Sequence, residues 1–133
     1  MNVVVADNDI ALLKSLEIVL KGEGHQVRTF SDPLEACRHL VDGYDLDVLV
    51  LDYLMPILTG TDLLCRVCQW REIDFTVILI SGHTDIIGLN DLEEIGVDHF
   101  LPKPIDLHRL CDLVAAGTAS KSGTVRHMNL ERA

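Results

Sequence analysis

Polar residues that could do chemistry follow four short apolar stretches of this chain. The pairs are Val3–Ala6 with Asp7 and Asn8, Val48–Leu51 with Asp52, Thr76–Ile80 with Ser81, and His99–Leu101 with Lys103. Short runs rich in valine, isoleucine and leucine indicate strands buried in a parallel sheet, whose carboxyl ends share one edge. One aspartate after a strand is a weak signal, because aspartate is common in turns. Four such ends together predict a site at that edge.

The residue types at these ends indicate which chemistry the site would support. The carboxylates of Asp7 and Asp52 would repel each other unless a cation lay between them, and oxygen ligands without thiolates or many nitrogens suit Mg²⁺. The hydroxyl of Ser81 and the ammonium of Lys103 suit an anion such as a phosphoryl group. The sequence therefore predicts a site for a divalent cation beside a phosphoryl-type anion.

Strands and helices alternate along the chain. A further strand, Gln26–Phe30, is less apolar and is expected near a sheet edge. The predicted helices are Ile10–Lys21, a segment from Pro33 to Gly43, Thr61–Arg71, Asp85–Ile95 and a segment from Leu107 to Gly117. Their predicted inward faces include Ile10, Leu34 and Leu107. Five alternating pairs predict an α/β fold, a doubly wound parallel sheet with helices on both faces.

Composition limits the class of protein. The chain has 133 residues, 48% of them hydrophobic, which suits one globular domain, here assigned to residues 1–117. Residues 118–133 have little periodicity and are predicted to be a flexible tail or a truncated linker. A net charge of −10 argues against direct binding of nucleic acid. No apolar run reaches membrane-spanning length and the start lacks signal-peptide character, so we expect a cytoplasmic protein without membrane contact.

Two of the four cysteines form a Cys65-x-x-Cys68 pair that invites a redox or zinc hypothesis. Both cysteines lie inside a predicted helix, whereas redox pairs of this spacing lie at a helix N-terminus after a strand. No second pair stands at zinc spacing. We therefore interpret these cysteines as structural.

Four motifs together resemble one family closely, the receiver domain of two-component response regulators (CheY-like). They are Val5-Ala6-Asp7-Asn8-Asp9, Leu51-Asp52-Tyr53-Leu54-Met55-Pro56 with Gly60, Ile80-Ser81-Gly82-His83, and Phe100-Leu101-Pro102-Lys103-Pro104. The resemblance extends over roughly residues 2 to 116. It implies a five-stranded flavodoxin-like fold with strand order 2-1-3-4-5.

The resemblance also implies roles for single residues. Asp52 would be the nucleophile that takes a phosphoryl group from a phosphohistidine of a sensor histidine kinase or phosphotransfer protein. Mg²⁺ would be held by Asp7, Asn8, Asp52 and the backbone carbonyl of Leu54. Lys103 would pair with a phosphoryl oxygen, and its bond to Pro104 would be cis. Such a domain is a phosphoacceptor that catalyses its own phosphorylation and dephosphorylation, rather than a conventional turnover enzyme.

A conformational switch is implied as well. Ser81 would hydrogen-bond the phosphoryl group, and the aromatic ring of Phe100 would rotate into the space that Ser81 vacates. The surface formed by the helix over 85–95, the fifth strand and the last helix would then change shape. That surface would bind a downstream output domain or protein, or a second copy of the chain as a homodimer.

Asn8 departs from the family, which usually has a second acidic residue there. We expect weaker Mg²⁺ binding and slower phosphorylation as a result. The departure motivates one alternative, a pseudo-receiver that acts as a phosphorylation-independent interaction module. A second alternative, a flavodoxin-like cofactor-binding protein or oxidoreductase, is disfavoured because the glycine-free acidic loop Asp7–Asp9 would repel a cofactor phosphate.

Overall fold

Helices and strands alternate along the described part of the chain. The computed structural model describes residues 1–82 and 94–117. The elements are β1 (Asn2–Ala6), α1 (Ile10–Gly22), β2 (Gln26–Phe30), α2 (Pro33–Val41), β3 (Val48–Asp52), α3 (Gly60–Cys68), β4 (Thr76–Ser81), β5 (His99–Pro102) and α5 (Leu107–Ala115). The helix predicted over 85–95 lies almost wholly outside these residues, and so does the predicted tail, 118–133.

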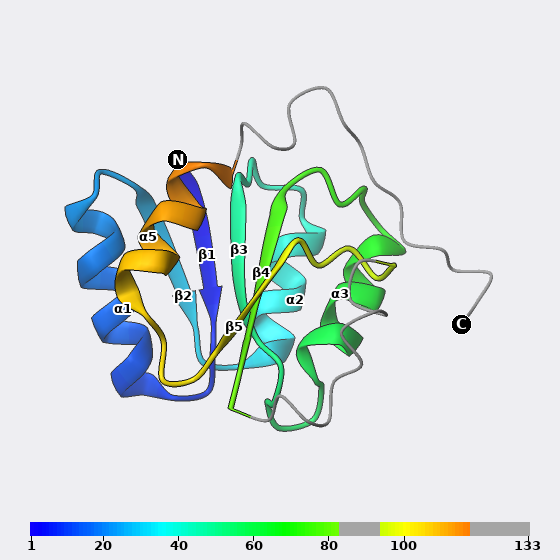
Figure 1. Ribbon diagram of the computed structural model, residues 1–133. Helices are drawn as coiled ribbons and strands as arrows, with labels where there is room; N and C mark the ends of the chain where they lie inside the picture. The colour runs from blue at the N-terminus through cyan, green and yellow to red at the C-terminus, as the bar shows by residue number, and fades with distance from the viewer. Residues whose placement is uncertain (83–93, 118–133) are drawn as a thin grey trace.

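The five strands form one parallel sheet in the order β2-β1-β3-β4-β5, as predicted. Helices α1 and α5 cover one face and α2 and α3 cover the other (Figure 1). β2 lies at a sheet edge, in agreement with its polar sequence. All strands run the same way, so their carboxyl ends meet at one edge of the sheet.

Local sequence explains where the helices begin. Aspartates cap three of them: Asp9, Asp32 and Asp106 accept hydrogen bonds from the backbone N–H groups of Leu12, Leu34 and Arg109. Thr59 and Asp62 form a reciprocal capping box at the start of α3. Each of these caps lies at the carboxyl edge of the sheet, so the caps also fix the loops that surround the predicted site. No helix among the described residues is long and apolar enough to span a membrane.

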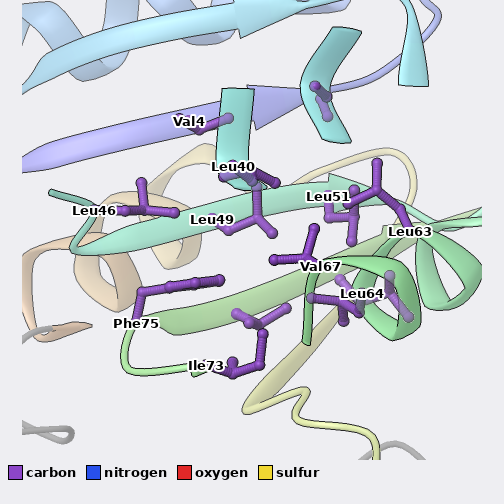
Figure 2. Close-up of a cluster of buried hydrophobic side chains, with 14 of the residues drawn as sticks. Val4, Leu40, Leu46, Leu49, Leu51, Leu63, Leu64, Val67, Ile73 and Phe75 are labelled. Carbon is purple, nitrogen blue, oxygen red and sulfur yellow. The ribbon is translucent and has the colours of Figure 1, made fainter. Parts of the chain in front are cut away.

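Two buried hydrophobic clusters lie on the two faces of the sheet. The cluster on the α2–α3 face includes Leu40, Leu49, Leu51, Leu63 and Phe75 (Figure 2). The cluster on the α1–α5 face includes Leu16, Leu20, Val50, Ile78 and Leu110. Full burial of such a side chain stabilises the fold by about 1.5–3 kcal/mol. β3 and β4 are buried along their whole length, which holds their carboxyl ends rigidly.

Three residues expected on inward helix faces are exposed, and those predictions were wrong. Ile10 is 58% exposed, and Leu34 and Leu107 are each 41% exposed. Each stands in the first turn of its helix, ahead of the buried positions Leu13, Ala36 and Leu110. Helix α3 also ends at Cys68 rather than at the predicted Arg71, because Gln69 adopts the C-cap position.

Candidate functional site

Three charged side chains from different elements meet at the carboxyl edge of the sheet. Asp7 follows β1, Asp52 is the last residue of β3, and Lys103 follows β5. The Nζ atom of Lys103 lies 3.0 Å from Oδ2 of Asp7 and 3.4 Å from Oδ2 of Asp52. Asp7 is fully buried and Asp52 is 3% exposed. The structure thus brings together two carboxylates and one ammonium, as the strand-end pattern predicted.

Two hydrogen bonds fix Asp7, one through its backbone N–H and one through its carboxylate. Its N–H donates to the carbonyl of Phe30 at 3.1 Å, and its Oδ1 accepts from the N–H of Asp9 at 2.8 Å. Within the described residues, the buried Oδ2 makes no aligned hydrogen bond, although the Lys103 ammonium is close. A buried carboxylate oxygen in this state has capacity to ligate a cation.

Asp52 is fixed by the loop that follows it. The N–H of Tyr53 donates to the carbonyl of Ile80 at 2.8 Å, and the N–H of Gly60 donates to the carbonyl of Tyr53 at 2.7 Å. A Cβ atom on Gly60 would lie 2.5 Å from the carbonyl oxygen of Asp52, so only glycine permits this close approach. Within the loop, Ile57 adopts φ 76°, which is uncommon for a β-branched residue.

Lys103 is positioned by β4 and by a turn. Its N–H donates to the carbonyl of Ser81 at 2.8 Å, and Ser81 is buried and in register with Pro102 of β5. The Lys103–Pro104 peptide bond is cis, as the family resemblance implied. These contacts connect the ends of β4 and β5, and β4 is the strand next to β3, which carries Asp52.

The electrostatics of the site follow from this burial. Burial and the neighbouring Asp7 carboxylate raise the pKa of Asp52 to about 6, and Lys103 only partly offsets them. Burial would lower the pKa of Lys103, but the close contacts of its ammonium with the Asp7 and Asp52 carboxylates outweigh burial and raise it. Lys103 is therefore a permanent cation near neutral pH, while Asp52 titrates within the physiological range.

The donor set fits Mg²⁺ only in part. Two carboxylates face one another, but Asn8 is exposed and supplies no third charge. Within the described residues, no group of three or more His, Cys, Asp or Glu side chains could hold a metal ion. The oxygens of Asp7 and Asp52, an amide oxygen of Asn8 and a backbone carbonyl make an all-oxygen set suited to a hard cation held weakly.

Two further predicted site residues, Leu54 and Phe100, are among the described residues. The Leu54 side chain is 51% exposed, so any ligand role belongs to its carbonyl. Phe100 is half-buried against the α2–α3 cluster. His83 lies outside the described residues.

Sequence reasoning missed the role of Gly60. The sequence offered this glycine only as a member of the motif around Asp52, whereas the close approach to the Asp52 carbonyl makes glycine necessary. The local signal was present: Gly60 directly follows Thr59, the helix-capping residue, so it opens a helix instead of ending one.

The cysteines lie away from this edge of the sheet. Cys65 and Cys68 are half-buried in α3, and the Sγ of Cys68 donates to the carbonyl of Cys65 at 3.2 Å. Burial raises the pKa of both thiols, which keeps them protonated and unreactive. This agrees with the structural interpretation.

Comparison with known proteins identifies the family. Residues 3–115 match the response regulator receiver domain. The DNA-binding transcriptional regulator NtrC of Azospirillum brasilense is 34% identical over 112 residues, which cover 84% of this chain and 23% of that protein. FixJ of Bradyrhizobium diazoefficiens, a transcriptional regulatory protein, is 29% identical over 85% of this chain and 54% of its own length. The chain thus spans between about a quarter and about half of these relatives.

Solved structures agree with the sequence matches. The Francisella response regulator 1452 receiver domain superimposes with a TM-score of 0.74 at 29% identity, covering 86% of this chain and 93% of that one. A response regulator receiver protein from Pseudomonas putida gives a TM-score of 0.77 at 28% identity, covering 86% and 94%. The family match, the strand order and the four strand-end motifs lead to one conclusion: this chain belongs to the response regulator receiver domain family.

Proposed function

We propose that this receiver domain accepts a phosphoryl group on Asp52 from a phosphohistidine of a sensor kinase or phosphotransfer protein. The observation that carries the proposal is the buried pair of carboxylates, Asp7 and Asp52, with the Lys103 ammonium 3.0 Å and 3.4 Å from them. Because the pKa of Asp52 is about 6, most of its carboxyl groups are ionised at neutral pH and can act as nucleophiles.

The transfer has a simple balance. A carboxylate oxygen of Asp52 forms a bond to phosphorus, and the phosphorus–nitrogen bond to the imidazole breaks. The imidazole leaves with that electron pair as a neutral ring, because its other nitrogen carries a proton in the phosphohistidine donor. Lys103 pairs with a phosphoryl oxygen and neutralises part of its charge. Mg²⁺, when bound by Asp7, Asn8, Asp52 and the Leu54 carbonyl, supplies further neutralisation of the phosphoryl oxygens. Attack of water on the acyl phosphate reverses the modification.

The same geometry supports a switch through Ser81. The backbone carbonyl of Ser81 accepts a hydrogen bond from the N–H of Lys103. Ser81 is buried at the end of β4, the strand next to the one that carries Asp52. A phosphoryl group on Asp52 attracts the Ser81 hydroxyl, and Phe100 of the adjacent β5 moves inward. The altered face is that of β5 and α5 with the segment between β4 and β5.

The partners follow from the relatives. Several are named as transcriptional regulators, and each is longer than this chain. We propose a sensor kinase as phosphoryl donor and an output domain or protein as receiver of the switched surface, with homodimerisation through the same surface as a second use of it. The family match gives no support to the pseudo-receiver alternative, and it sets aside the flavodoxin-like cofactor protein.

The test is intact mass spectrometry after incubation with Mg²⁺ and acetyl phosphate. We expect a single phosphoryl adduct on the wild-type protein, none on Asp52→Ala, and none when EDTA removes Mg²⁺. Thermal unfolding of Asp52→Ala checks that the variant is folded.

The result that would contradict the proposal is equally plain. An absent adduct on folded wild-type protein, even at saturating Mg²⁺ and donor, would make the domain a pseudo-receiver. An adduct that persists on Asp52→Ala would place the phosphoryl group on another residue.

A further inference from the structure

A groove of about 630 Å³ lies at the amino edge of the sheet, the edge opposite Asp52. It is lined by the first residues of β1 and β2, by the ends of α1 and α2, and by residues that follow these two helices. This volume is within the range of pockets that hold small organic ligands. The groove shares no residue with the phosphoacceptor site, so its occupant is a separate question.

The floor of the groove is apolar. Three largely buried side chains, Val4, Leu40 and Leu46, lie beneath it and are 3%, 0% and 8% exposed. Figure 2 shows these three side chains together at one end of the buried cluster, away from Leu63. An apolar group that entered the groove would extend an existing hydrophobic surface.

One wall of the groove is aromatic and rigidly held. The rings of His39 and Tyr44 are stacked, with centroids 3.9 Å apart and an interplanar angle of 21°. The Nη1 atom of Arg71 donates to the carbonyls of Leu40 and Tyr44, both at 3.0 Å, which fixes the backbone of this wall. Tyr44 is nevertheless 47% exposed, so part of its ring remains available to a ligand.

The charge at the mouth is positive, in contrast to the chain as a whole. The guanidinium carbon of Arg28 lies 5.3 Å from the centre of the Tyr44 ring. Lys21 also lines the groove, but it is paired with Glu17 at 3.2 Å, so Arg28 supplies the main charge. Asp45 is the one carboxylate in the lining and would repel an extended polyanion.

We propose that this groove binds a small amphipathic anion: a planar ring system carrying one carboxylate, sulfonate or phosphate group. The ring packs on Tyr44 and on the apolar floor, and the acidic group pairs with the guanidinium of Arg28. A planar guanidinium beside an aromatic face suits such a ligand better than an ammonium does, because it stacks and binds two oxygens at once. Binding here requires neither Asp52 nor Mg²⁺.

The test uses anilinonaphthalene sulfonate, a planar aromatic anion whose fluorescence rises in apolar surroundings. We expect saturable binding of one probe per chain, and about tenfold weaker binding to Arg28→Ala and to Tyr44→Ala. Arg28→Lys restores only part of the affinity. Lys14→Ala, which removes an exposed cation from the opposite side of α1 to the buried stripe, leaves the affinity unchanged.

Backbone amide NMR shifts locate the probe. The largest shifts are expected at Val27, Arg28, Leu40 and Asp45. The proposal is overturned if the largest shifts fall near Leu54 and Ile57 instead, or if Arg28→Ala binds as tightly as the wild type. It is also overturned if neutral N-phenylnaphthylamine binds as tightly as the anion. Phosphorylation of Asp52, measured separately by mass, has no bearing on these outcomes.

Discussion

Aspartates accept hydrogen bonds from backbone N–H groups at both edges of the sheet, but the carboxyl edge also gathers charged side chains around one another. At the amino edge, charged groups bind backbone groups: Asp47 accepts from the N–H of Asn2 at 2.8 Å, and Asp98 accepts from the N–H of Val77 at 2.8 Å. At the carboxyl edge, Asp7 and Asp52 face each other and share Lys103. The first arrangement closes the fold, while the second gathers charges that repel.

This difference indicates which edge supports chemistry. A charged group that hydrogen-bonds a backbone group stabilises a protein by about 1.5–3 kcal/mol. A buried carboxylate beside another carboxylate costs stability, and the raised pKa of Asp52 reports that cost. The carboxyl edge is therefore held in an unfavourable arrangement by the rest of the fold, which is the usual condition of a functional site.

The largest effect is expected where the backbone approaches Asp52. Gly60→Ala places a Cβ atom 2.5 Å from the Asp52 carbonyl, so we expect a loss of about 3 kcal/mol in unfolding free energy. Urea denaturation measures it. Gly22→Ala is the matched control, since no heavy atom lies within 4 Å of the new methyl group. A Gly60→Ala protein as stable as wild type would mean that the loop is not fixed as described.

At the amino edge, Arg71→Ala should cost about 2 kcal/mol of unfolding free energy, because two carbonyls lose a charged donor. Thermal and urea unfolding measure this, with the exposed Arg38→Ala as control at below about 0.5 kcal/mol. If both substitutions lowered the unfolding free energy equally, the hydrogen bonds of Arg71 at the amino edge would not be stabilising as described.

Removing the Asp52 carboxylate should raise the unfolding free energy, whereas the two preceding substitutions lower it. The pKa of Asp52 is raised from 3.8 to about 6, so the folded state holds this proton more tightly than the unfolded state. The unfolding free energy therefore falls as pH rises from about 4 to 6 and stays lowered above that. In EDTA near pH 7.5, Asp52→Asn should be more stable than wild type by about 1–2 kcal/mol. The gain should vanish below about pH 4, and a gain that is the same at every pH would contradict this explanation.

The smallest effect concerns the metal. Asn8→Asp adds a third carboxylate near Asp7 and Asp52, so we expect Mg²⁺ to bind about five- to tenfold more tightly. Calorimetric titration measures this affinity without reference to phosphorylation. Gln26→Glu adds the same charge at the amino edge and should leave the affinity unchanged. An unchanged affinity in Asn8→Asp would show that the Asn8 position does not contribute to the metal site.

Much of the fold was predictable because its signals are local. Valine-rich runs ending on Asp7 and Asp52 fixed the strands, aspartate caps fixed the helix starts, and the resulting alternation required a parallel sheet. The exposure of Ile10, Leu34 and Leu107 was not predictable, since helical periodicity shows which face of a helix is apolar but not which of its turns packs against the sheet.

The functional features of the molecule were also predictable only in part. Its charged members, Asp7, Asp52 and Lys103, could be found because each follows a strand. The local signal at Gly60 marks a helix start but does not reveal the close approach to the Asp52 carbonyl, which depends on how the loop folds. The groove beside Tyr44 depends on segments remote in sequence. Such close approaches between parts of the chain arise from packing in the folded protein, and a single sequence does not reveal them.

The most direct test of the proposed division between the edges is phosphoryl occupancy, by intact mass, of Asp52→Asn and Arg71→Ala side by side. The temperature is one at which both are folded, with Mg²⁺ and acetyl phosphate present. We predict no adduct on Asp52→Asn, although it is the more stable protein, and wild-type occupancy on Arg71→Ala, although it is the less stable. An adduct on Asp52→Asn, or its loss from folded Arg71→Ala, would contradict the assignment of phosphoryl chemistry to the carboxyl edge.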